Sequence, residues 1–297
     1  MRSAAALCLV ICIIAAGCGG SSSAKEEPDA TLEDLLRAPG EDVAIVPGTA
    51  DFGPGSVRLT YLVVDGQSRV VTRPTAKVWL ARSLNGKPFL QTTARSELIG
   101  VEGGDDAGVG AIFVTRLEIP KPGKYWLLTE PIGGRKIQAV GNVVVKDKPV
   151  APAVGEQAVS SDTPTLENAT IKQLSTSRVP DSELYRLSVK DALAAKVPFV
   201  VTFATPAYCQ SRTCGPIVDV VSAVRKREAG SNVRFIHVEV YQDNDPAKGE
   251  NKWFKEWHLP SEPWVFLVGP DGKVRERFEG TVSVSELDAA VKKYLLA

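Results

Sequence analysis

Several residue types are scarce in this sequence: its 297 residues include one methionine, two histidines and five cysteines, and the formal net charge is zero. Zero net charge excludes a generally basic nucleic-acid-binding protein, and charges of neither sign form a long run. With 44% hydrophobic residues the chain can bury apolar cores, so wholesale disorder is excluded. The length suits two domains, and 25 glycines with 20 prolines favour turns and strands over helical bundles.

The N-terminal apolar run is shorter than a membrane span, which needs about 20 residues. It extends from Ala4 to Ala16 behind Arg2, and this pattern predicts a secretory signal over residues 1–17. The sequence AAGC, ending at Cys18, resembles a bacterial lipobox. That resemblance implies lipid on Cys18 and a location on the extracytoplasmic face of a bacterial envelope membrane. The residues after Cys18 are rich in glycine and serine and then acidic, which predicts a flexible tether over residues 18–40. The alternative is an ordinary signal peptide with an incidental Cys18.

Export would also determine which cysteines remain as free thiols in the mature protein. Cys8 and Cys12 leave with the signal and Cys18 carries lipid, so only Cys209 and Cys214 remain as thiols in the mature protein. Two cysteines that close together in an exported protein are expected to pair or to exchange disulfides.

Residues 41–148 alternate between apolar and polar residues in short runs separated by turn residues, which predicts an antiparallel β-sandwich. The expected strands are Val57–Val64, Ala76–Ala81, Ile112–Ile119, Tyr125–Leu128 and Ile137–Val145, with two more near Val70 and Ile99. The segment PKPGKYW, residues 120–126, resembles the start of a strand in exported immunoglobulin-like modules. The resemblance implies a spacer or docking module. This half contains no histidine and no clustered metal ligands.

Residues 149–180, which are rich in proline and small residues, are interpreted as the linker between two domains. In residues 181–297, helical and strand patterns alternate, which predicts an α/β sandwich with a mixed sheet. The expected elements are a helix over Val189–Lys196 capped by Ser188, strands over Pro198–Phe203 and Val233–Tyr241, a helix over Ile217–Arg227, a short helix over Trp253–His258, strands over Trp264–Val268 and Val274–Phe278, and a last helix opened by a capping box of Ser283 and Glu286.

Two segments of this half resemble thioredoxin-like proteins: PFVVTFATPAYC at residues 198–209 and LPSEPWVFLVGPDG at residues 259–272. The resemblance implies a thioredoxin-like domain that exchanges disulfides with protein thiols or disulfides of exported proteins, without a cofactor. It also implies that Pro263 is a cis-proline facing the redox pair.

The spacing of the pair departs from that family, because Cys209 and Cys214 are separated by four residues instead of two. Residues five apart on a helix rise about 7.5 Å, whereas a disulfide needs Cα atoms about 4.4–6.8 Å apart. The pair therefore cannot bridge within an unbroken helix. Pro216 is tolerated in a first helical turn, so we expect the helix to begin near Thr213 with Cys209 in the preceding loop. Alternatively, the segment unwinds when the disulfide forms.

Cys209 is the expected nucleophile, because the strand before it sets the alignment, and Cys214 would resolve the mixed disulfide. Aligning on Cys214 and the following Gly-Pro gives the opposite assignment. Arg212 and the helix N-terminus would favour the thiolate. Against this, neither Thr202 nor Phe203, where the buried acid of thioredoxins could align, is acidic. Glu262 places negative charge near the thiols.

Other interpretations stay open. The disulfide could be structural, in a non-catalytic binding module. Another interpretation is a thiol peroxidase, because the cysteine spacing resembles atypical peroxiredoxins that carry both cysteines on one helix. In that family a threonine occupies the position of Pro206. Copper delivery would use His258 with the pair, whereas His237 is expected to be packed or hydrogen-bonded within a strand. Residues 243–245 lack the glycine and terminal glutamate of a calcium loop and are expected to be solvated.

Overall fold

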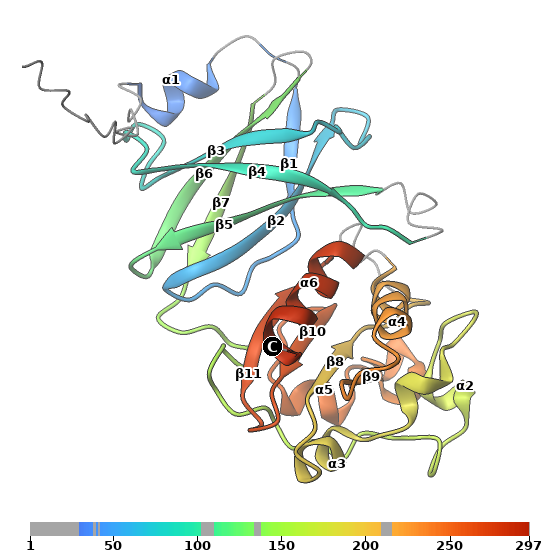
Figure 1. The fold of residues 1–297 in the computed structure, drawn as a ribbon. Helices are drawn as coiled ribbons and strands as arrows, with labels where there is room; N and C mark the ends of the chain where they lie inside the picture. Colours follow the sequence, from blue (N-terminus) through green and yellow to red (C-terminus); the bar gives the residue numbers. More distant parts are fainter. Residues whose placement is uncertain are drawn as a thin grey trace, which may run out of the picture.

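A computed structural model of the chain describes residues 30–37, 40, 42–101, 110–133, 138–208 and 216–296. All five cysteines and Arg212 lie outside these described residues. The described chain is mostly β and forms two packed units, a seven-stranded antiparallel sheet and a four-stranded sheet flanked by helices (Figure 1). Within these residues no helix is long and apolar enough to cross a membrane.

Neighbouring strands of the first unit are all antiparallel and follow the order β1-β2-β5-β4-β3-β6-β7. The strands are β1 (Val43–Pro47), β2 (Gly55–Asp65), β3 (Thr75–Ala81), β4 (Leu90–Leu98), β5 (Ala111–Ile119), β6 (Gly123–Ile132) and β7 (Ala139–Val145).

Strand β4 belongs to both halves of this sheet. Its residues from Leu90 to Arg95 pair with β3, and those from Arg95 to Leu98 pair with β5. The sheet therefore folds over on itself and encloses an apolar core to which β2, β3, β5, β6 and β7 all contribute. Across this core Tyr61 shares a hydrogen bond of 2.6 Å with Thr129 and stacks on Phe113.

Strand β1 was not expected from the sequence pattern, and β4 corresponds to the strand expected near Ile99 but lies ahead of that residue. Strand β4 is largely polar and buries only Ala94 completely, so it lacks the apolar alternation of its neighbours. Strand β1 lies at the sheet edge and is only partly buried. Of the two further strands expected, Val70 forms an isolated bridge to Val64, and Ile99 follows the end of β4.

The described end of the expected tether is folded. Residues Leu32–Leu36 form helix α1, which Thr31 caps. Leu32 is completely buried in a small apolar cluster with Trp79 on β3. The tether prediction is wrong for these residues, because the apolar face of the helix packs on the sheet; residues 18–29 lie outside the described part.

The second unit has the strand order β11-β10-β8-β9, in which β8 and β9 are parallel and the other neighbours antiparallel. Its strands are β8 (Phe199–Phe203), β9 (Arg234–Val238), β10 (Trp264–Val268) and β11 (Val274–Glu279). Its helices are α2 (Ile171–Leu174), α3 (Val189–Ala194), α4 (Ile217–Arg227), α5 (Lys252–Glu256) and α6 (Val284–Leu295), with short 3₁₀ helices η1 (Ser182–Tyr185), η2 (Gln242–Asn244) and η3 (Pro246–Lys248).

Side chains of this sheet alternate between two apolar layers. Val200 and Val265 point to the layer that contains α4 and α6. Phe203, Trp264 and Phe266 point to the layer that contains α3 and α5. Because both faces are covered, the central strands β8 and β10 are buried along their whole length. This is the reason for their continuous apolar runs.

Most predicted elements of this unit are present, and the bounds of α4 and β10 agree with those expected. Ser283 caps α6 by accepting a hydrogen bond of 3.0 Å from the Glu286 amide. The capping box is wrong in its second half, because the Glu286 carboxylate pairs with Arg58 of the first unit.

Residues 149–180 lie between the two sheets in the chain, and several of them pack in the core of the second unit. Ala151 and Ala158 are buried in the same core as Val189. Trp257 Nε1 donates to Ser161 Oγ at 3.1 Å. The second unit therefore draws on the chain from about residue 151, ahead of the expected boundary at 181.

The two units meet along β2, β4, β5, α6 and the turn before α6 (Figure 1). Leu62, Ile99 and Ile112 of the first sheet share one apolar cluster with Val282 and Val284. The Val284 amide donates to the Ile99 carbonyl at 2.9 Å.

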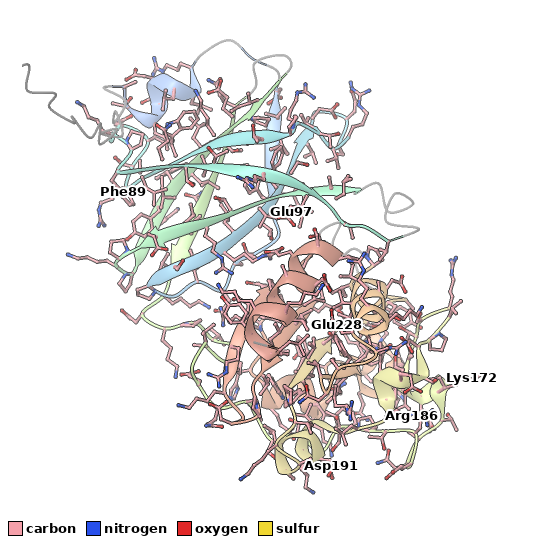
Figure 2. All side chains as sticks on the ribbon, viewed as in Figure 1. Phe89, Glu97, Lys172, Arg186, Asp191 and Glu228 are labelled. Carbon is pink, nitrogen blue, oxygen red and sulfur yellow. The ribbon has the colours of Figure 1, made fainter. Side chains whose placement is uncertain are left out.

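Polar contacts reinforce this seam. Ser283 Oγ donates to Glu97 Oε2 at 2.6 Å, and Glu97 lies on the side of the first sheet that faces α6 (Figure 2). Arg58 is buried and donates at 2.7 Å to each carboxylate oxygen of Glu286. Arg58 also donates to the carbonyls of Glu279 and Thr281.

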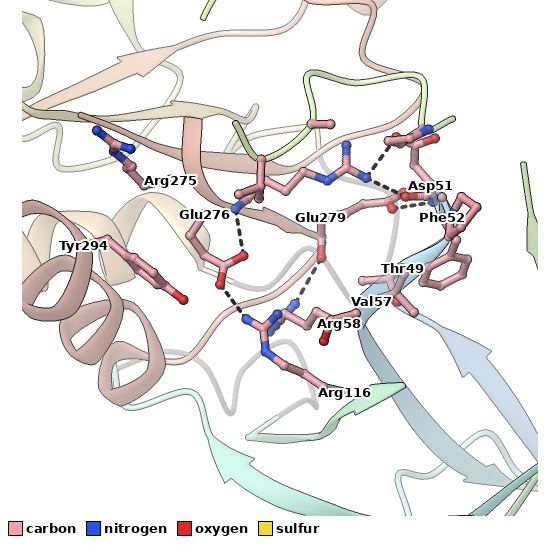
Figure 3. A pocket seen from close by; sticks show the side chains of 17 residues that line it. Thr49, Asp51, Phe52, Val57, Arg58, Arg116, Arg275, Glu276, Glu279 and Tyr294 are labelled. Atoms are coloured by element: carbon pink, nitrogen blue, oxygen red, sulfur yellow. Dashed lines mark hydrogen bonds and ion pairs between the residues drawn. The ribbon is translucent and has the colours of Figure 1, made fainter. Parts of the chain in front are cut away.

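A cavity of about 420 Å³ opens in the seam beside these contacts (Figure 3). Arg116 and Arg277 of its lining pair with acids of the opposite unit: Arg116 donates to Glu276 at 2.5 Å, and Arg277 pairs with Asp51 at 3.1 Å. Arg275 pairs with Asp271 of its own unit at 2.8 Å. The charged side chains that line the cavity therefore form ion pairs with other residues of the protein. These pairs help to hold the two units together.

Removing the Arg58 side chain is expected to destabilise the protein strongly. Arg58→Ala leaves the Glu286 carboxylate without its partner in a partly buried site, which costs about 3 kcal/mol or more. Arg69→Ala is the matched control, because the exposed Arg69 side chain pairs with Asp65 at the surface, where solvent screening leaves an ion pair with little effect on stability. Equilibrium unfolding in urea measures both. Equal losses in the two variants would contradict a seam held by Arg58.

Candidate functional site

The site is located by the chain segments on either side of the two late cysteines. Cys209 directly follows Tyr208, the last described residue of the segment that leaves β8. Cys214 is two residues ahead of Pro216, which precedes α4. The cysteines and Arg212 lie outside the described residues, as does Thr213, where the helix was expected to begin. Their described surroundings define the site.

The parallel pairing of β8 and β9 places these surroundings at the carboxyl ends of the two strands. The Ala204 amide continues the ladder by donating to the Val238 carbonyl at 3.2 Å. Beyond this point the chain leaves the sheet and runs into Cys209. The carboxyl ends of parallel strands in open sheets are common ligand sites.

Pro263 lies at the same edge, immediately ahead of β10. The Glu262–Pro263 peptide bond is cis, as expected for Pro263. Pro263 is buried, and its carbonyl accepts a hydrogen bond of 2.9 Å from the Gly280 amide. The Pro263 segment is thus fixed to the turn that follows β11.

Glu262 reaches from this segment to the loop after β8. Its Oε2 accepts a hydrogen bond of 2.8 Å from the Thr205 amide, and Tyr241 OH donates to its Oε1 at 3.3 Å. Burial raises the pKa of Glu262 from its ordinary 4.5 to about 7, and the nearby charge of Glu239 adds to the rise. The two hydrogen bonds act in the opposite direction but only in part offset burial.

His237 is a buried and fully hydrogen-bonded residue, as predicted. Its Nδ1 shares a hydrogen bond of 2.7 Å with Tyr185 OH, and its Nε2 lies 3.0 Å from the Ala204 carbonyl oxygen. Burial lowers the pKa of His237, so the imidazole is neutral at neutral pH. A neutral ring donates through one nitrogen and accepts through the other.

Glu239 completes the cluster from the chain just after β9. Its Oε1 accepts hydrogen bonds of 2.6 Å and 3.0 Å from the amide and hydroxyl of Thr176. Thr176 Oγ1 in turn accepts a hydrogen bond of 3.1 Å from the amide of Ala207, a residue of the loop that leads to Cys209. Residues of the expected linker therefore hold the site loop in place.

Sequence reasoning identified Pro263 and the charge of Glu262, but it missed Tyr185, Thr176, Glu239 and Tyr241. One signal was present. His237, Glu239 and Tyr241 alternate in the run predicted as a strand, so they share one face. A polar face on an otherwise apolar strand indicates buried hydrogen-bond partners from elsewhere in the chain.

The described residues hold no group of three or more metal-ligating side chains. His258 is exposed in the turn that ends α5. In the acidic loop, Asp243 pairs with Lys248 at 3.0 Å and Asp245 caps η3 through the Ala247 amide. These acids have partners within the loop itself.

The arrangement places two titratable groups beside the chain that leaves β8. It combines a buried neutral imidazole with a carboxyl group of pKa about 7, and both contact the residues that lead from β8 toward Cys209. A group whose pKa lies near the working pH is suited to general acid–base chemistry.

No family model matches the chain, and no curated protein matches it. Among solved structures, the chain is similar to a thioredoxin-family thiol:disulfide interchange protein from Chlorobium tepidum TLS, with 17% identity over 50% of this chain and 99% of that chain and a TM-score of 0.29. The chain is also similar to StoA from Bacillus subtilis, with 14% identity over 48% of this chain and 99% of that chain and a TM-score of 0.29. A further similar structure is trypsin-activated alpha-2-macroglobulin from Escherichia coli, with 12% identity over 45% of this chain and 9% of that chain and a TM-score of 0.26. With TM-scores this low, function has to be inferred from the residues of this chain.

Breaking the Tyr185–His237 bond is expected to cost stability. Tyr185→Phe leaves a buried ring nitrogen without that partner, which costs about 1–3 kcal/mol. Tyr294→Phe is the control, because the Tyr294 hydroxyl forms no hydrogen bond with a described residue, and its loss is expected to stay within about 0.5 kcal/mol. Urea unfolding at pH 7.5 separates the two. If both variants matched the parent protein, the Tyr185–His237 contact would contribute nothing.

Proposed function

We propose that this protein is an extracytoplasmic thiol–disulfide oxidoreductase of the thioredoxin-like type, held at a membrane by lipid on Cys18. One observation carries the proposal. The chain between β8 and α4 contains Cys209 and Cys214, and the Thr205–Glu262 hydrogen bond ties its beginning to the Pro263 segment. The described chain thus leaves β8 toward the two cysteines at the edge of the sheet where Pro263 lies.

The topology of the second unit supports a thioredoxin-like domain. The pair follows the central strand β8, a crossover through α4 leads to the parallel strand β9, and the antiparallel strands β10 and β11 precede the last helix. The first 30 residues or so of this unit, from about 151, wrap around that arrangement.

An immunoglobulin-like assignment is proposed for the first unit. Its order β1-β2-β5-β4 followed by β3-β6-β7 corresponds to the two sheets of a constant-type immunoglobulin domain. Tyr125 near the start of β6 is buried, and its hydroxyl donates to the Lys121 carbonyl at 2.6 Å. A tyrosine bonded back to the preceding corner is a hallmark of such domains.

In the proposed reaction Cys209 attacks a sulfur of a disulfide in an exported protein, and Cys214 resolves the mixed disulfide that forms. Pro263 shapes the groove for the substrate chain. Arg212 and the N-terminus of α4 favour the thiolate of Cys209. No cofactor is needed, since the two thiols carry both electrons.

A second candidate is a non-catalytic binding module with a structural disulfide. The four-residue separation of Cys209 and Cys214 favours it, because a wider pair departs from the spacing of thioredoxins. The two candidates differ in whether the pair forms mixed disulfides with other proteins.

Cys214→Ser is expected to accumulate mixed disulfides with exported proteins, because the second thiol is needed to release them. Non-reducing electrophoresis of cells that express this variant should show adducts that a reductant dissolves. Cys209→Ser and the double variant are controls and should show none.

If no adducts form and the native pair resists mild reductant, the structural disulfide is correct. Adducts with Cys209→Ser alone would exchange the roles of the two cysteines. A thiol peroxidase would in addition consume peroxide, which disulfide exchange leaves untouched.

Cys18→Ser is expected to move the protein from the membrane fraction to the soluble extracytoplasmic fraction, since this thiol is the proposed attachment point of the lipid. Incorporation of labelled fatty acid measures the modification directly. Cys12→Ser, within the signal, should leave the label in place. Full labelling of the Cys18→Ser protein would exclude the anchor.

A further inference from the structure

Another cavity, of about 440 Å³, lies at the carboxyl end of β9 and shares no lining residue with the cavity in the seam. One wall consists of Ala169 and the α2 residues from Lys172 to Leu174, and the other is the loop from Tyr241 to Asn244. Ligand pockets in proteins have volumes of about 300–1,000 Å³. The cavity is therefore large enough for a small molecule or for a single side chain of another protein.

Hydrogen bonds within the protein join the two walls. Asn244 Nδ2 donates to the carbonyls of Lys172 and Gln173 at 3.3 Å and 3.1 Å. Asn251, which also lines the cavity, donates to the Glu239 carbonyl at 2.5 Å. The cavity is thus preformed, and a preformed site lowers the ordering cost of binding.

Glu239 lines this cavity with an acceptor atom that no described residue uses. The residue is 5% exposed, and its Oε1 is held by the amide and the hydroxyl of Thr176. Its Oε2 is buried and forms no hydrogen bond with any residue that the structure describes. His237 and Tyr241, two positions before and after Glu239, line the same cavity, so the Glu239 side chain faces it. A buried carboxylate oxygen without a donor is costly, and most buried polar atoms in proteins have a partner.

We propose that this cavity binds a protonated primary amine whose ammonium group donates a hydrogen bond to Glu239 Oε2. The rest of the lining suits the alkyl part of such a ligand. Tyr241 and Trp253 supply aromatic walls, and Ala169 and Leu174 supply aliphatic ones. The site is separate from the proposed thiol–disulfide chemistry and does not involve the two cysteines.

The geometry favours an ammonium group over a guanidinium group. A guanidinium typically binds a carboxylate through two parallel hydrogen bonds, which require both oxygens. Because Thr176 occupies Oε1, Glu239 offers a single oxygen, which matches a compact ammonium group. A metal ion needs several ligands, and the described residues hold no group of three side chains that could provide them.

Two other charged residues line the cavity. Asp243 is paired with Lys248 at 3.0 Å, so its charge is already balanced within the loop. Lys172 is exposed on α2 at the surface of the molecule (Figure 2). Its positive charge opposes the entry of a second cation.

Glu239→Gln tests the contact directly, because a glutamine oxygen can still accept from Thr176 while its NH₂ group replaces Oε2. Isothermal titration calorimetry at neutral pH measures the affinity for n-butylamine. We expect Glu239→Gln to weaken binding by about 10- to 100-fold, the effect of a hydrogen bond to a charged group. Glu250→Gln is the matched control. It removes the same charge from an exposed residue outside the lining and should bind as the parent protein does.

Lys172→Gln should act in the opposite direction. Removing the positive charge from the lining is expected to tighten binding of n-butylamine by about 2- to 5-fold. Loss of folding could not produce a gain in affinity, so this variant keeps the test valid if Glu239→Gln is unstable.

The amine can be a free small molecule or the side chain of a lysine in a polypeptide. A blocked glycine–lysine–glycine peptide separates these sources. Binding of the peptide shows that the cavity admits a lysine side chain, whereas binding of n-butylamine alone shows a site for free amines. N-butylacetamide has the same alkyl chain without the charge and should bind at least about 10-fold more weakly than n-butylamine.

Three results would each overturn the proposal: no binding of either amine up to about 10 mM, equal binding of N-butylacetamide, or parent-like affinity in folded Glu239→Gln. None of them would affect the proposed thiol–disulfide exchange, which is measured separately through Cys209 and Cys214.

Discussion

Strand β10 runs antiparallel to β8 with Trp264 opposite Phe203, and the geometry of the candidate site follows from this register. Continuing the same register past the ends of the two strands brings Glu262 beside Thr205, where the hydrogen bond between them forms. The parallel pairing of β9 on the other side of β8 places His237 under the same loop. A slip of one residue would exchange the two faces of each strand and dissolve the cluster.

The first unit supports this edge through a short chain of contacts. Glu279 at the end of β11 accepts hydrogen bonds of 2.8 Å and 2.7 Å from the amides of Ala50 and Asp51. Its other carboxylate oxygen accepts a hydrogen bond of 2.9 Å from the hydroxyl of Ser261, which lies two residues before Pro263. Gly280, whose amide holds the Pro263 carbonyl, approaches Gly48 so closely that a Cβ would overlap its carbonyl oxygen. The first unit therefore packs directly against the segment that carries Pro263.

The sequence indicated those parts of the fold that depend on local pattern. Apolar runs marked β8 and β10, helical spacing gave α4, and Ser283 was recognised as the cap of α6. The bounds of β4 could not be predicted, because its pairing with two neighbours, and not apolar burial, holds it in the sheet. The local pattern predicts a capping box for Glu286, but its actual partner, Arg58, lies 228 residues away in the sequence.

The same distinction holds for the candidate site. Pro263 could be found from a local motif, whereas the contact of Thr176 with Glu239 depends on how a supposed linker packs. Long-range polar contacts leave little periodicity in a sequence. They become visible only when the strands that carry them are placed side by side.

His237 and Glu262, the two titratable groups at this edge, change the stability of the fold in opposite directions as the pH rises. The pKa of His237 is lowered, so its contribution is complete above the ordinary value of 6.5 and is lost as the pH falls below it. The pKa of Glu262 is raised, so its contribution is complete below the ordinary 4.5 and is lost as the pH rises through about 7. No pH satisfies both groups. A glutamine at position 262 would keep the bond to Thr205 without opposing the fold at neutral pH. Stability alone therefore does not explain a carboxyl group there.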